Sequence, residues 1–95
     1  MKREDFIFTI GYSGSSPVVD AAGKKKSGKL SPEQLLEAGL FRYAFAAKLF
    51  DGGEQESFIQ AFNQKSGMQM RDFEQLKRLF GVYEVPENPG KALYV

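Results

Sequence analysis

The sequence contains no histidine and no cysteine. Histidine is the side chain that titrates near neutral pH, and it is the commonest metal ligand and acid–base catalyst. Without cysteine, the chain can form no disulfide, no thiolate nucleophile and no zinc site with cysteine ligands. These absences remove the side chains on which most metal centres and hydrolytic triads depend. We therefore expect a protein that is not an enzyme and that holds no metal and no cofactor.

The chain also lacks an excess of charge and a long apolar run. Thirteen basic residues stand against twelve acidic ones, for a formal net charge of +1, so no overall field draws the protein toward nucleic acid or anionic lipid. No apolar segment approaches the roughly 20 residues that span a bilayer. The N-terminus has no apolar stretch long enough for a signal peptide. We expect a soluble, cytoplasmic protein with no membrane partner.

Aromatic side chains, in contrast, are abundant, with nine Phe and four Tyr in 95 residues. Each buried ring removes about 150–250 Å² from water. Because 42% of the residues are hydrophobic, the composition excludes wholesale disorder. A chain of this length suits one domain. We expect a single globular domain over residues 1–95, with a flexible loop rich in glycine, serine and lysine over residues 13–30.

Helix signals dominate from Ser31 onward. The run Ser31-Pro32-Glu33-Gln34 has the pattern of a capping box, in which the serine and glutamine side chains bond backbone amides at the start of a helix. Capping residues and terminal glycines or turns predict four helices, over residues 31–38, 40–50, 54–66 and 72–80. The second is apolar almost all round, which is typical of a central core helix. A fifth helix over residues 17–22 and an extended segment there both fit the sequence.

Extended segments are predicted near both ends of the chain. Residues 6–12 are aromatic and β-branched in a pattern typical of a strand. Residues 82–85 and 92–95 are shorter candidates, and pairing of the first strand with either one would satisfy its backbone groups. The expected fold is α+β and mainly α: four helices, or five, with a minimal β element from the N-terminal strand and the C-terminal segment.

Motifs that carry chemistry each fail at a residue that their mechanism needs. The segment Gly23–Lys29 matches the first seven positions of a P-loop, but Leu30 stands where a hydroxyl must bind magnesium. The segment Gly11–Ser15 faintly resembles a nucleophile elbow, yet the chain has no histidine to act as its base. A helix-turn-helix is disfavoured because the connection before the last helix is too long.

Four of the thirteen basic residues fall within six positions: Lys24, Lys25, Lys26 and Lys29. A run of charge is most often a solvated loop. These lysines, however, precede the helix start at Ser31, and the N-terminal end of a helix favours anions. We therefore keep phosphate or nucleic-acid contact through this basic loop as the alternative hypothesis. Because no aromatic residue lies within the loop for bases to stack on, nucleic acid is the less favoured partner.

The favoured hypothesis is a small non-catalytic module for protein–protein interaction or self-association. Several large apolar residues lie near loops or in the tail, where a small core does not need them. Those expected in an interface are Met68, Met70, Tyr83, Leu93 and Tyr94. Exposed apolar patches above a few hundred Å² mark interfaces. The opposing interpretation is that the tail packs over its own core.

Overall fold

The computed structural model describes all 95 residues and begins with a short helix, whereas the sequence predicted a strand. Helix α1 (Arg3–Ile7) takes the first residues of the expected 6–12 strand, and strand β1 (Thr9–Ser13) begins only after it. Asp5, Phe6 and Ile7 are buried on α1. The prediction is wrong for residues 6–8 and confirmed for residues 9–12. A short apolar run does not by itself separate a strand from a buried helix.

Strand β2 (Ser16–Val19) follows β1 after a tight turn, and the two strands pair in antiparallel fashion. After Asp20 the chain forms helix α2 (Ala21–Ser27). The expected loop over residues 13–30 is therefore wrong for these residues, and so is a helix over residues 17–22. The physical reason is local: β-branched Val18 and Val19 favour a strand, and Asp20 is an effective helix cap.

The sheet has three strands in the order β1-β2-β3, with β3 (Leu93–Tyr94) parallel to β2. Strand β1 thus pairs with β2. The expected pairing of this strand with residues 82–85 or 92–95 is wrong. Residues 82–85 form no strand. The C-terminal segment joins the sheet at its other edge through backbone bonds from Val95 to Val19 and from Ala21 to Val95. Closing the short turn between β1 and β2 costs little conformational entropy, so β1 pairs with the strand that follows it in sequence.

Six helices and this small sheet make the fold α+β and mainly α. The helices after α2 are α3 (Pro32–Glu37), α4 (Phe41–Asp51), α5 (Glu56–Ser66) and α6 (Phe73–Phe80). These four confirm the expected helices to within two residues at each end. The expected total of four or five is too low because α1 and α2 have only five and seven residues, too few to show a clear helical period.

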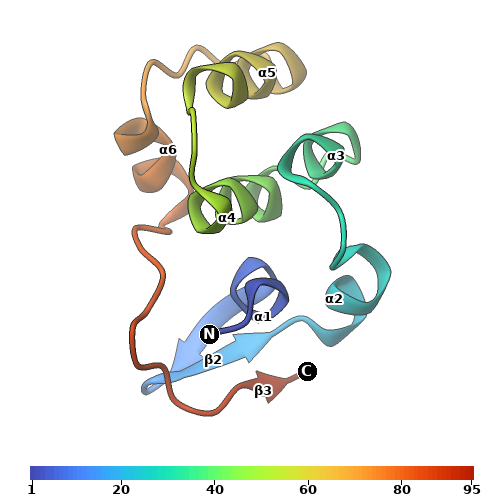
Figure 1. Ribbon diagram of the computed structural model, residues 1–95, viewed down its shortest axis with the longest axis vertical. Helices are drawn as coiled ribbons and strands as arrows, with labels where there is room; N and C mark the ends of the chain where they lie inside the picture. The colour runs from blue at the N-terminus through green and yellow to red at the C-terminus, as the bar shows by residue number, and fades with distance from the viewer.

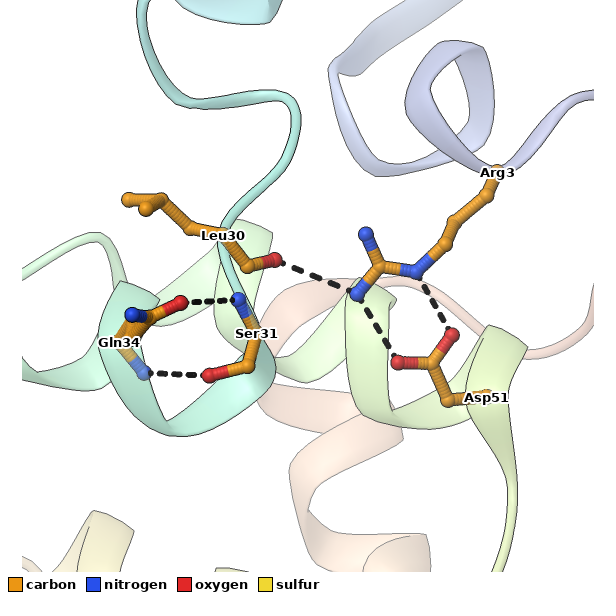
Figure 2. Close-up of polar contacts among 5 residues, drawn as sticks. All are labelled: Arg3, Leu30, Ser31, Gln34 and Asp51. Atoms are coloured by element: carbon orange, nitrogen blue, oxygen red, sulfur yellow. Dashed lines mark hydrogen bonds and ion pairs between the residues drawn. The ribbon is translucent and has the colours of Figure 1, made fainter.

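Two sets of polar contacts hold the chain where it enters α3, as Figure 2 shows. The predicted capping box is complete: the Ser31 hydroxyl accepts from the Gln34 N–H at 3.1 Å, and the Gln34 side-chain oxygen accepts from the Ser31 N–H at 2.9 Å. Beside it, the Arg3 guanidinium donates to the Asp51 carboxylate at 2.7 and 2.9 Å and to the Leu30 carbonyl at 3.3 Å. One arginine thereby joins α1, the end of α4 and the chain that enters α3.

Helix α4 is the centre of the core, as its apolar sequence predicted. Residues 44–47 are all buried, and Phe45 is fully enclosed, with the ring centroids of Phe73 and Phe80 at 5.0 and 5.6 Å. In Figure 1, α3, α5 and α6 lie on one side of α4, and α1 and the sheet lie on the other. The protein therefore has a helical end and a sheet end, with α4 between them.

Candidate anion-binding site

The lysine run lies on helix α2 and just beyond it. Asp20 caps this helix: its carboxylate accepts from the Gly23 N–H at 3.0 Å and from the Tyr43 hydroxyl at 2.9 Å. These bonds, the one from Gly23 first, hold the pKa of Asp20 below its ordinary value. Lys24–Lys26 occupy the last turn of the helix, where positive charge complements the helix dipole. Lys29 follows just after the helix.

The four lysines line a single hollow of about 480 Å³. Three other elements contribute to its wall, because Glu4 comes from α1, Leu30 from the chain before α3, and Tyr94 from β3. The structure thus brings together the four lysines that the sequence singled out. It adds an acidic and an aromatic residue that lie far from them along the chain.

One of the four lysines already has a carboxylate partner. The Lys24 ammonium donates to Asp5 at 2.7 Å, and the Tyr94 hydroxyl donates to the same carboxylate at 3.0 and 3.1 Å. The Lys24 ammonium also lies 4.8 Å from the centroid of the Tyr94 ring, within the range of a cation–π contact. The hydrogen bond to Asp5 raises the pKa of Lys24, so this side chain stays charged at neutral pH. Lys24 therefore ties α1, α2 and β3 together.

The other three lysines are exposed and form no ion pair. Glu4 is the only carboxylate on the wall of the hollow. Three unpaired ammonium groups against one carboxylate leave a positive surface there, although the charge of the whole chain is close to zero. Chemically, such a surface attracts anions that carry several charged oxygens, phosphate groups above all.

The five residues expected in a protein interface do not lie on one surface. Met68 and Met70 belong to the connection between α5 and α6, at the opposite end of the molecule from β3, which carries Leu93 and Tyr94 (Figure 1). Tyr83 lies on the segment after α6. Met70 is partly buried against the core, whereas the other four side chains are 40–55% exposed. Leu93 and Tyr94 are neighbours on one strand, and they are the part of this set that the structure keeps together.

Sequence reasoning missed a second, smaller hollow, of about 90 Å³, between β1 and the segment that follows α6. Arg42 of α4 lines it and donates to the Thr9 carbonyl at 3.0 Å. Tyr12 and Tyr83 also line it, and each is more than half exposed. The signal that could have found this hollow is Arg42 itself, the only charged residue in the first half of a mostly apolar helix.

Acidic side chains do not gather anywhere in the protein in a group that could hold a metal ion. None of the six helices combines the length and the apolar character that crossing a bilayer requires. Comparison of the chain with protein-family models, with curated proteins and with solved structures finds no match.

Proposed function

We propose that the protein binds the phosphate groups of an anionic ligand in the hollow lined by Lys24, Lys25, Lys26 and Lys29. The convergence of four lysines on one hollow, in a chain with a net charge of only +1, is the observation that carries this proposal. Three of them are exposed and free of ion pairs, so a phosphate replaces no internal partner when it binds.

An extended phosphate backbone suits this hollow better than one small ion. Lysine ammonium groups are flexible point charges without the fixed fork of arginine, so they favour several phosphates along a chain over one tightly oriented phosphate. Tyr94 is 54% exposed, and a tyrosine ring gives bases a stacking surface. The aromatic residue that the lysine run lacks in sequence thus comes from β3. These features favour single-stranded nucleic acid as the ligand.

The first test is the salt dependence of binding to a fluorescein-labelled oligothymidylate, followed by fluorescence anisotropy. For single strands, the logarithm of the binding constant falls with the logarithm of salt concentration by about 0.7 per phosphate contacted. Contact with the three unpaired lysines therefore predicts a slope of about −2. Inorganic triphosphate as competitor distinguishes a nucleic-acid ligand from a small polyphosphate. Absence of binding at low salt to both probes would refute the proposal.

A charge-matched pair of variants separates the hollow from the net charge. The triple variant Lys25→Gln, Lys26→Gln and Lys29→Gln should lose binding, because it removes the unpaired ammonium groups while leaving Lys24 on Asp5. Its control removes the same charge at exposed positions outside the hollow, through Arg71→Gln, Arg78→Gln and Lys91→Gln. The control should retain affinity. Equal losses in both variants would mean that overall charge, and not the hollow, determines binding.

A second proposal, self-association through the outer face of the sheet, is supported by the C-terminal strand. Leu93 is paired with Val18, and alternation along β3 places both opposite the face that carries Tyr94. Leu93 is 44% exposed and Val95 is 68% exposed, and Figure 1 shows the helices gathered on one side of the sheet. Light scattering over a concentration series should then show a dimer that Leu93→Ser weakens. A monomer at every concentration would contradict this proposal.

A further inference from the structure

Arg42 is a partly buried cation without a carboxylate partner. Arg3, the other partly buried arginine, forms two hydrogen bonds with Asp51. Arg42 instead forms no ion pair, and its one hydrogen bond runs from Nη1 to the Thr9 carbonyl at 3.0 Å. A guanidinium has five N–H groups in a rigid fork, so most of the donors of Arg42 remain available to a ligand.

The hollow beside Arg42 has the size and the lining for a small molecule with one apolar part. Its volume is about 90 Å³, and one water needs about 10–15 Å³ of such space, so a ligand of about six heavy atoms fits. Phe6, Ile7 and Ala46, all buried, contribute to the apolar part of the lining together with Val82. A ligand that fills this hollow therefore needs a short hydrocarbon portion as well as an acceptor for Arg42.

Two polar residues of the lining, Tyr12 and Glu84, limit the charge of a ligand that can bind in the hollow. Tyr12 is half exposed at the rim of the hollow, and burial of its hydroxyl raises the pKa of Tyr12 despite the opposing effect of Arg42. It therefore stays protonated at neutral pH and is able to donate a hydrogen bond. Glu84 is the only acidic residue of the lining. It forms no ion pair with Arg42. Its negative charge repels an anionic ligand, so the hollow favours a ligand with a single negative charge over one with several.

We propose that this hollow binds a small monocarboxylate, with the carboxylate on the free side of the Arg42 guanidinium. The planar fork of arginine matches a carboxylate with two parallel hydrogen bonds. The alkyl chain of the ligand lies against Phe6, Ile7 and Ala46. Phosphate is disfavoured here because it has no apolar part to cover that lining, and burying its charge against apolar groups is unfavourable. The site is separate from the lysine hollow and does not depend on its function.

The test is a titration of the isotope-labelled protein with sodium butyrate, followed by amide and arginine side-chain NMR signals. We expect saturable shifts at the Arg42 Nε–H and at the amides of Thr9, Ala46 and Val82. The dissociation constant should be on the order of millimolar for so small a ligand. Acetate should bind about tenfold more weakly, because two methylene groups are missing from the apolar contact. Butylammonium and sodium chloride should give no saturable shift.

Variants assign the binding to the guanidinium. Arg42→Lys keeps the charge but loses the fork, and should weaken butyrate binding about tenfold or more. Arg78→Gln removes an exposed arginine that does not line the hollow and should leave the affinity unchanged, as should the triple lysine variant. Glu84→Gln removes the opposing charge from the rim and should tighten binding.

Several results would overturn the proposal. These are shifts that do not saturate, shifts that butanol reproduces, and an unchanged affinity in Arg42→Lys. A loss of binding in the triple lysine variant would assign the ligand to the other hollow. If Arg42→Lys fails to fold, Glu84→Gln decides, since this exposed residue makes no hydrogen bond in the protein. Unchanged butyrate affinity in Glu84→Gln then refutes the site.

Discussion

At the scale of single residues, Asp20 joins three parts of the fold through one carboxylate and one amide. Its side chain caps α2 at Gly23 and accepts from Tyr43 of α4, and its N–H donates to the Phe8 carbonyl at 2.8 Å. The backbone bond from Gly23 and the bond from Tyr43 lower the pKa of Asp20. Both bonds are stronger with the ionised carboxylate, so ionisation of Asp20 contributes to the stability of the folded state.

We predict that Asp20→Asn makes stability less dependent on acid pH. Because the folded-state pKa of Asp20 is lowered, its contribution is present above the unfolded pKa and is lost as pH falls through the folded one. At neutral pH the variant should be less stable by roughly 0.5–1 kcal/mol, since asparagine still caps but carries no charge. The difference should shrink as the pH falls below the ordinary aspartate pKa of about 3.9, and it should vanish once the carboxyl group is protonated in the folded state as well. Urea denaturation at several pH values measures this.

The control for that series is Asp72→Asn at the start of α6. Asp72 caps its helix through the Gln75 N–H at 3.0 Å and has no tyrosine partner, so this change removes a capping charge alone. A smaller loss at neutral pH is expected there. Parallel stability curves for the wild type and Asp20→Asn at every pH would contradict the prediction.

The residues of the candidate sites differ in how far the sequence reveals them. The four lysines could be recognised because they are close together in the sequence, and in the structure they line the same hollow. Tyr94, however, lies 89 positions from Asp5, and no local pattern predicts that the two meet. Arg42 was not singled out from the sequence, because the hollow that it lines also takes residues from α1, β1 and the segment 81–84. Contacts between residues so far apart in the sequence depend on how the helices and strands are arranged in space, which the spacing of residues along the chain does not reveal.

At the scale of elements, the helices from α3 onward could be predicted because their signals are local. The capping box at Ser31, the cap at Asp72 and the glycines after α5 and α6 each act within a few residues. Gly67 and Gly81 take φ values of 77° and 69°, the left-handed conformation that ends a helix and favours glycine. Elements α1 and α2 were missed because they are short and depend on contacts with other elements, whereas β2 agrees in part with the extended alternative for residues 17–22.

Residues 82–85 show why a strand-like sequence is not enough. This segment lies across the small hollow from β1, yet its residues make no backbone hydrogen bond. The Thr9 carbonyl of β1 accepts from Arg42, so a side chain occupies part of the edge that a further strand would need. The predicted pairing of this segment with the first strand is therefore wrong, although residues of both line the same hollow.

At the scale of the whole molecule, α4 links two ends that differ in chemistry. The sheet end carries the lysine hollow and the exposed C-terminal strand, and the helical end consists of α3, α5 and α6 (Figure 1). Helix α4 packs on both α1 and α3. From the centre of α4, Phe45 contacts the rings of Phe73 and Phe80 on α6. Tyr43 packs against Phe8 with the rings tilted and their centroids 4.5 Å apart. This arrangement favours one cooperative core over two independent halves.

We predict that Phe45→Ala destabilises both ends of the molecule together. Truncating a fully buried phenylalanine costs about 3–5 kcal/mol, a large share of the roughly 5–15 kcal/mol that stabilises a typical domain. The chain has no tryptophan, so tyrosine emission reports on the surroundings of β1, α4, β3 and the segment after α6. Far-ultraviolet circular dichroism reports on the helices. In urea, both signals should change at one midpoint in the wild type and at one lower midpoint in the variant.

The control is Leu79→Ala, at a position 42% exposed, which should lower the free energy of unfolding much less. If Phe45→Ala instead melted the helices while tyrosine emission kept its original midpoint, the two ends would be separate folding units.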